Sequence, residues 1–132
     1  MTASLRTDVV ILACAISAGI HGALAPEHFE EGTGAGAGFV AATVLLAGLV
    51  LALTLRPASG AAVAGAAIVL AGVIASYALA VTTGFPVLHP EAEPVEGIAL
   101  FSKAIEAVGV AAAASLLWRR PTGALTPQPK EA

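Results

Sequence analysis

The sequence predicts an all-α integral membrane protein, an antiparallel four-helix bundle with both termini in the cytoplasm. Of the 132 residues, 58% are hydrophobic and only 11% are charged, whereas a soluble domain is about 45–50% apolar and about 25% charged. Four stretches of the chain stay apolar over about 20 residues, the length that a helix needs to cross the hydrocarbon core of a bilayer. Basic residues flank these stretches on one side, and most acidic residues flank them on the other.

The four predicted spans cover about residues 8–25, 36–55, 61–83 and 97–118. Pro26 ends the first span, and we expect it to open a short helix at the membrane surface. Pro57 follows the second span, Pro86 follows the third, and Trp118 is an interfacial anchor at the end of the fourth. Residues 1–120 therefore form one transmembrane domain, and the proline-containing residues 121–132 are predicted to be a disordered cytoplasmic tail.

The first span also has the pattern of a secretory signal peptide, with Arg6 before an apolar run and small residues at 23–25. Pro26 would directly follow the cleavage site, which is an unfavourable position. We therefore expect the first span to remain in the protein.

The distribution of charge predicts the orientation, because cytoplasmic loops carry an excess of Lys and Arg. Five of the six basic residues flank one end of the spans: Arg6, Arg56, Arg119, Arg120 and Lys130. Six of the nine acidic residues lie in the two other loops: Glu27, Glu30, Glu31, Glu91, Glu93 and Glu96. The acidic loops are predicted to face outward, and the Ala- and Gly-rich composition favours a bacterial cytoplasmic membrane.

Small residues four apart predict close helix packing, since helices in lipid associate through tight contact. The third span has Gly72 and Ser76 at this spacing, and the fourth has Gly109 and Ala113.

Lys103 and Glu106 lie inside the fourth span, and Glu106 is about 15 Å from its outer end. Ionisable residues at such depth are costly and face a protein interior. Three interpretations stay open: an ion pair that locks helix packing, a pair that handles protons, ions or a ligand, or a Lys103 side chain that extends outward to water.

All three histidines lie at the predicted outer side, together with several carboxylates. Imidazole and carboxylate groups are ligands for Cu, Zn or Fe. The candidate metal ligands are His21, His28, His89, Glu27 and Glu96. The alternatives are an acidic, solvated surface with one buried His, with His28 at that surface, and a set of proton-sensing imidazoles.

Two segments resemble small four-span bacterial membrane proteins with no assigned activity. One runs from His21 to Glu31, and the other from Gly84 through Glu96 to Glu106. The resemblance implies a topology and no reaction. An acid is common in those proteins near the position of Lys103, so Lys103 is a departure.

The leading functional hypothesis is a non-catalytic accessory subunit that packs against other membrane chains or against itself, surrounded by lipid. Motifs for phosphate, dinucleotide or nucleophilic chemistry do not occur in the sequence, which favours a protein without catalytic activity. The high apolar and low charged fractions exclude a nucleic-acid binder. The alternatives are a metal-binding protein and a small proton-coupled transporter. Small multidrug transporters have a similar length, but their essential Glu belongs to the first span, whereas Glu106 lies in the fourth.

Overall fold

The computed structural model describes residues 1–85 and 91–119, and within these it contains four α-helices. They are α1 (Ala3–Glu31), α2 (Thr33–Leu55), α3 (Gly60–Thr82) and α4 (Gly97–Trp118). The shortest, with 22 residues, is about 33 Å long, which exceeds the hydrocarbon core of about 30 Å. All four helices are long and apolar enough to cross a membrane. The predicted all-α class with four such helices is confirmed.

The helix boundaries agree closely with the prediction for α2, α3 and α4. α4 begins and ends at the predicted residues, α3 differs by one residue at each end, and α2 begins three residues earlier. Thr2 caps α1, because its hydroxyl accepts a hydrogen bond from the Leu5 backbone N–H at 3.3 Å. Ser59 caps α3 in the same way, accepting from the Ala62 N–H at 3.2 Å. Such caps satisfy backbone donors that a helix start leaves free.

The prediction that Pro26 ends the first helix is wrong. α1 continues through Pro26 to Glu31, and Gly32 alone separates it from α2. A proline inside a helix removes one backbone hydrogen bond, here to the Gly22 carbonyl, but membrane helices tolerate this loss. His21 and His28 therefore stay in one helical register, two turns apart.

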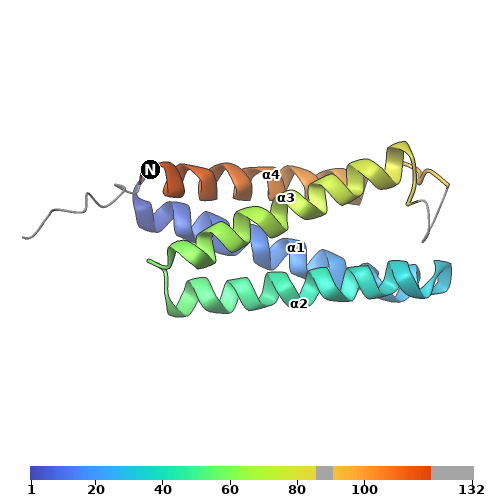
Figure 1. The fold of residues 1–132 in the computed structure, drawn as a ribbon, viewed down its shortest axis with the longest axis horizontal. Helices are drawn as coiled ribbons and strands as arrows, with labels where there is room; N and C mark the ends of the chain where they lie inside the picture. The colour runs from blue at the N-terminus through green and yellow to red at the C-terminus, as the bar shows by residue number, and fades with distance from the viewer. Residues whose placement is uncertain (86–90, 120–132) are drawn as a thin grey trace, which may run out of the picture.

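The four helices lie alongside one another in an elongated bundle (Figure 1). The start of α1 and the end of α4 lie at one end, and the α1–α2 junction and the start of α4 lie at the other. α1 packs chiefly against α2 and α4, and α3 packs chiefly against α4 and α2. The contacts of α1 with the other helices are the most extensive, so the core is organised mainly around α1.

Small residues allow α4 to approach its neighbours closely. A Cβ atom at Gly109 would lie 2.6 Å from the Ala13 Cβ and 2.8 Å from Leu70 Cδ1. Ala113, one turn later, is fully buried. Gly72 of α3 instead has no neighbour within 4 Å of such a Cβ, so the close helix packing predicted for the Gly72 and Ser76 pair does not form at Gly72 among the described residues.

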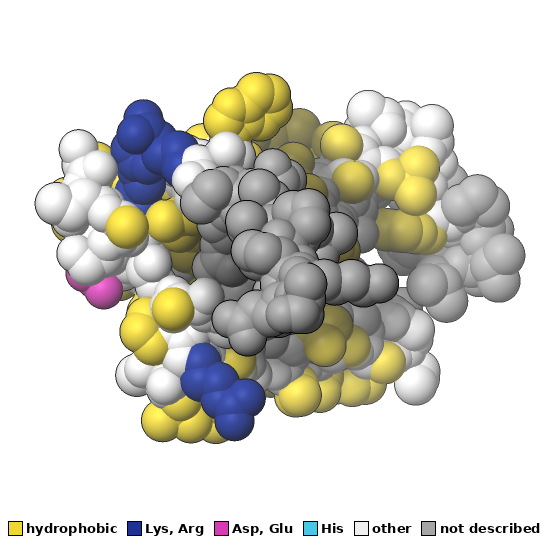
Figure 2. All heavy atoms as spheres, turned by 60° about the vertical axis from the view of Figure 1, so that its left-hand side comes forward, with side chains coloured by type: hydrophobic (Ala, Val, Ile, Leu, Met, Phe, Trp, Pro, Cys, Tyr) yellow, Lys and Arg dark blue, Asp and Glu magenta, His cyan; other side chains and the backbone are white. Residues whose placement is uncertain are grey.

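The outer surface of the bundle is apolar along its length and charged at its ends. Ile68 is 72% exposed and Trp118 is 92% exposed. Figure 2 brings forward the end that holds the N-terminus, where basic side chains stand among apolar ones. The described basic residues at this end are Arg6, Arg56 and Arg119. An apolar belt with charged ends is the surface that a bilayer requires.

Candidate functional site: a buried ion pair beneath a cavity

Glu106 is the centre of a buried polar cluster. Its side chain is 0% exposed, and its Oε2 lies 2.6 Å from Lys103 Nζ. The other oxygen, Oε1, accepts hydrogen bonds from the Ser17 hydroxyl at 2.7 Å and from the Ser102 hydroxyl at 2.9 Å. One carboxylate oxygen is therefore hydrogen-bonded and the other is ion-paired, and such pairing is what allows a charge to be held inside an apolar bundle.

Lys103 connects this cluster to a cavity that its side chain lines. Its side chain is 14% exposed, its ammonium lies 3.4 Å from the Val73 carbonyl, and it stands 5.6 Å from the centre of the Tyr77 ring. The structure thus pairs Lys103 with Glu106 and turns the Lys103 stem toward α3, so the side chain does not extend outward to water. The interpretations as a packing lock and as a functional pair both remain compatible with this geometry.

His21 continues the cluster on α1. Its Nδ1 lies 2.8 Å from the Ser17 carbonyl oxygen and 3.3 Å from the Ser17 hydroxyl. Because a carbonyl can only accept, we assign the ring proton to Nδ1, and the Nε2 of the neutral imidazole then carries a lone pair. Ser17 therefore links the imidazole of His21 to the carboxylate of Glu106.

His28 lies two turns after His21 on α1, and its ring is held by the same kind of hydrogen bond. Its Nδ1 donates to the Leu24 carbonyl at 2.9 Å, which again leaves Nε2 as the acceptor nitrogen. The ring stacks on Phe39 of α2, with ring centroids 3.6 Å apart, and His21 lies 5.2 Å from the same phenyl ring. The unbroken α1 helix carries His28 onto α2, where its side chain is half-buried and only partly exposed to solvent.

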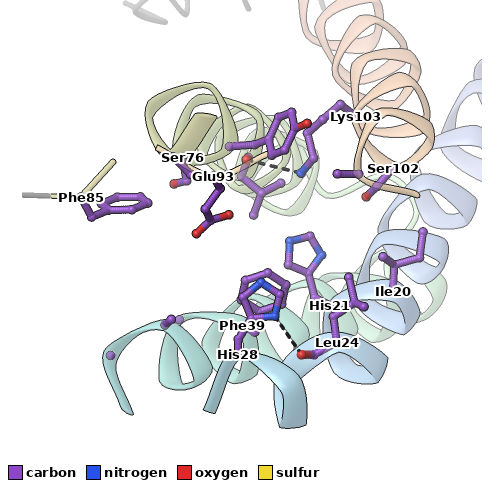
Figure 3. A pocket seen from close by; sticks show the side chains of 17 residues that line it. Ile20, His21, Leu24, His28, Phe39, Ser76, Phe85, Glu93, Ser102 and Lys103 are labelled. Carbon is purple, nitrogen blue, oxygen red and sulfur yellow. Dashed lines mark hydrogen bonds between the residues drawn. The ribbon is translucent and has the colours of Figure 1, made fainter. Parts of the chain in front are cut away.

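A cavity of about 320 Å³ lies between the four helices, toward the end of the bundle that holds the α1–α2 junction. Its polar lining includes His21, His28, Tyr77, Glu93 and Lys103, and two serines, Ser76 and Ser102. Figure 3 shows His21 and His28 rising from one side of the space and Glu93 and Lys103 approaching from the other. The apolar lining includes Leu24, Phe39, Val73 and Phe85. An apolar cavity with a few converging polar groups is typical of a small-molecule site.

A second hollow of about 120 Å³ adjoins the cavity. His28, Phe39, Tyr77 and Glu93 line both spaces. Three further carboxylates line only the outer hollow: Glu27, Glu31 and Glu96. The space that adjoins the cavity is therefore acidic, and we call this outer hollow the acidic vestibule.

The candidate metal ligands are divided between these spaces. His21 lines only the inner cavity, Glu27 and Glu96 line only the vestibule, and His28 lines both. His89 lies outside the described residues. Within residues 1–85 and 91–119, no three His, Cys, Asp or Glu side chains lie close enough together to hold a metal ion. The metal site stays a prediction that depends on His89.

Several residues of the site were not singled out from the sequence. Ser17 and Ser102 each precede an ionisable residue by four positions, so helical spacing alone could have placed them beside His21 and Glu106. Tyr77 also lines the cavity, and its buried hydroxyl has no hydrogen-bond partner among the described residues. The sequence predicts for Glu93 only a position in an acidic loop, and its spacing gives no signal that it lies over the cavity.

Comparison of the chain with protein-family models, with curated proteins and with solved structures gives no match. The geometry of the site is thus the basis for any functional proposal.

Proposed function

We propose that this chain is a small proton-coupled transporter, in which the cavity holds the substrate and the Lys103–Glu106 pair exchanges protons. The observation that carries the proposal is the position of the ion pair. Glu106 is fully buried, and its partner Lys103 lines the cavity. Intramembrane ionisable residues that border a cavity are characteristic of proton and substrate pathways.

The polar cluster supports proton exchange better than a packing lock. A lock needs only the two charges, whereas here the Ser17 hydroxyl connects Glu106 to a second titratable group, His21, that also lines the cavity. Protonation of Glu106 would remove the charge that holds Lys103 in place and free the Lys103 ammonium toward the substrate space. Proton binding and substrate binding are then coupled through one side chain.

The charges at the two ends of the bundle support an orientation in a bacterial cytoplasmic membrane. Arg6, Arg56 and Arg119 lie at the end that we propose to be cytoplasmic, with both termini, and the vestibule acids lie at the outward end. The helices would then cross the membrane in alternating directions. Glu30→Cys should react with a membrane-impermeant maleimide in intact cells, and Arg56→Cys should react only after lysis. The reverse pattern would contradict the orientation.

Transport is tested in proteoliposomes that enclose a pH-sensitive dye. A panel of small ammonium compounds, carboxylates and neutral polyols is added outside, and the internal pH is followed. We expect at least one class to change the internal pH with wild-type protein, Glu106→Gln to abolish the change, and the exposed Glu30→Gln to retain it. A flat response of the wild type to the whole panel, or an unchanged response of Glu106→Gln, would overturn the proposal.

The hypothesis of an accessory subunit stays a prediction. The exposed faces of α2 and α3 are apolar, which suits lipid as well as a partner helix. Co-purification of the tagged protein with another membrane chain in mild detergent would support it.

A further inference from the structure

We infer that the cavity binds a small organic cation, a protonated amine held by the acceptor groups of His21, His28 and Glu93. The inference rests on the proposed function, because it names the substrate class of the same cavity. Four features carry it: two imidazoles held with their acceptor nitrogens free, a carboxylate fixed over the cavity, aromatic walls, and an acidic vestibule.

The two imidazoles provide neutral acceptors. In each ring Nδ1 donates to the carbonyl four residues earlier, at 2.8 Å for His21 and 2.9 Å for His28. Nε2 of His21 makes no hydrogen bond with the described residues, although the side chain is only 9% exposed and lines the cavity. A ring nitrogen with a free lone pair can accept a hydrogen bond, and an ammonium group offers up to three donors.

Glu93 provides the negative charge. Its backbone N–H donates to the Ala80 carbonyl at 3.0 Å, which ties the loop before α4 to the end of α3. Its carboxylate points into the cavity from the side opposite His21 and His28 (Figure 3). A cation between these groups would form a charge-assisted hydrogen bond on one side and neutral hydrogen bonds on the other.

The aromatic walls favour the same kind of ligand. Phe39, Tyr77 and Phe85 line the cavity, and their ring faces attract cations and apolar groups alike. The Phe39–His28 stack forms one flat side of the space.

The overall charge of the route agrees with a cation. Glu27, Glu31, Glu93 and Glu96 line the two spaces, whereas Lys103 is their one described basic residue and is already neutralised by Glu106. Clefts lined by one sign of charge concentrate ions of the opposite sign. An anion would be repelled by the four carboxylates that line these spaces.

The same groups make binding depend on pH. The titratable side chains that face the imidazoles are Glu27 and Glu31 of α1, Tyr77 of α3, Glu93 and Glu96 of the segment before α4, and Lys103 and Glu106 of α4; α2 contributes only Phe39 and small residues. An imidazolium has no free lone pair and repels a cation. Proton uptake by His21 or His28 should therefore expel the ligand, which is the competition that proton–substrate exchange needs.

The test uses three probes of one shape: benzylamine, benzyl alcohol and benzoate. Binding to the purified full chain in detergent is measured by isothermal titration calorimetry at about pH 8 and at about pH 5, an interval in which a free imidazole titrates whereas a free carboxyl of Glu and an alkylamine stay charged. We expect benzylamine to bind most tightly at the higher pH and at least about tenfold more weakly at the lower pH.

Variants locate the binding. Glu93→Gln should weaken the affinity for benzylamine by about tenfold or more, and Glu30→Gln, an exposed acid outside both spaces, should leave it unchanged. Replacing both His21 and His28 by Phe should remove the pH dependence. Size-exclusion profiles and helical content would show whether each variant is folded, and any that is not would be replaced by Glu93→Ala or by the single His→Phe changes.

Tighter binding of benzoate or benzyl alcohol than of benzylamine would overturn the cation assignment, as would equal benzylamine affinity in Glu93→Gln and wild type. The proposed transporter would then stand on the vesicle assay alone. If the wild-type protein instead gives no internal pH change in that assay but still binds benzylamine, the proposed transport is overturned and the proposed binding site stands.

Discussion

At the scale of single residues, the ion pair of Lys103 with Glu106 is the main charged contact inside the bundle. The two are three positions apart on one helix, and side chains at this spacing are neighbours. Their partners Ser17 and Tyr77 come from other helices, and no spacing rule relates them to α4.

The buried pair should show strong coupling in stability. Glu106→Gln leaves the Lys103 ammonium without its counter-charge, and loss of one partner of a buried ion pair costs about 3–5 kcal/mol. The double variant Lys103→Met with Glu106→Gln should recover much of that loss, because no charge is then buried. Unfolding in mixed detergent, followed by circular dichroism, measures both.

A double variant as unstable as Glu106→Gln alone would show that the hydroxyls of Ser17 and Ser102, and not Lys103, depend on the carboxylate. A stable double variant that fails in the vesicle assay would separate the role of the pair in transport from any role in packing.

At the scale of the helices, the spans were predictable because apolar length can be read along the chain, and α4 has the predicted limits. The end of α1 was not predictable, because the proline rule describes helices in water. Pro26 lies in a helix that packs against α2, and the packing of Phe39 on His28 holds the last turns in place.

Pro26→Ala tests this account of α1. Since the helix already continues to Glu31, the substitution restores one backbone hydrogen bond without adding helical residues. The helical content measured by circular dichroism should stay the same, and the stability should stay the same or rise. A clear gain in helical content would mean that Pro26 does end the helix.

Packing between helices is tested at Gly109. A methyl group there would meet Ala13 and Leu70 at 2.6 and 2.8 Å, so Gly109→Ala should lower the free energy of unfolding by about 1–3 kcal/mol. Gly72→Ala is the matched control, because nothing lies within 4 Å of the added methyl group. Equal effects of the two substitutions would contradict the close contact of α4 with α1 and α3.

At the scale of the whole molecule, the two ends of the bundle differ in chemistry. Three described basic residues stand at one end, and the cavity, the vestibule and their carboxylates lie toward the other. The net charge of -3 averages over these unlike surfaces.

Cys14 reports on the integrity of the whole bundle. It is the single cysteine of the chain and is 0% exposed within the core. A small maleimide should fail to label it in mild detergent and should label it fully in sodium dodecyl sulfate, as measured by mass spectrometry. Rapid labelling in mild detergent would show that α1 is not enclosed by the other helices.

The sequence by itself determined the number of long apolar helices, nearly all of their limits, and the separation of basic from acidic residues. These are properties of position along the chain, where hydropathy and charge can be read directly. Only the tertiary structure decided that Ser17 meets Glu106, 89 residues away, that His28 lies on Phe39, and that Glu93 covers a cavity. Such contacts depend on how each helix is rotated about its own axis. In an apolar bundle the faces of each helix differ little in hydrophobicity, so side-chain packing decides that rotation.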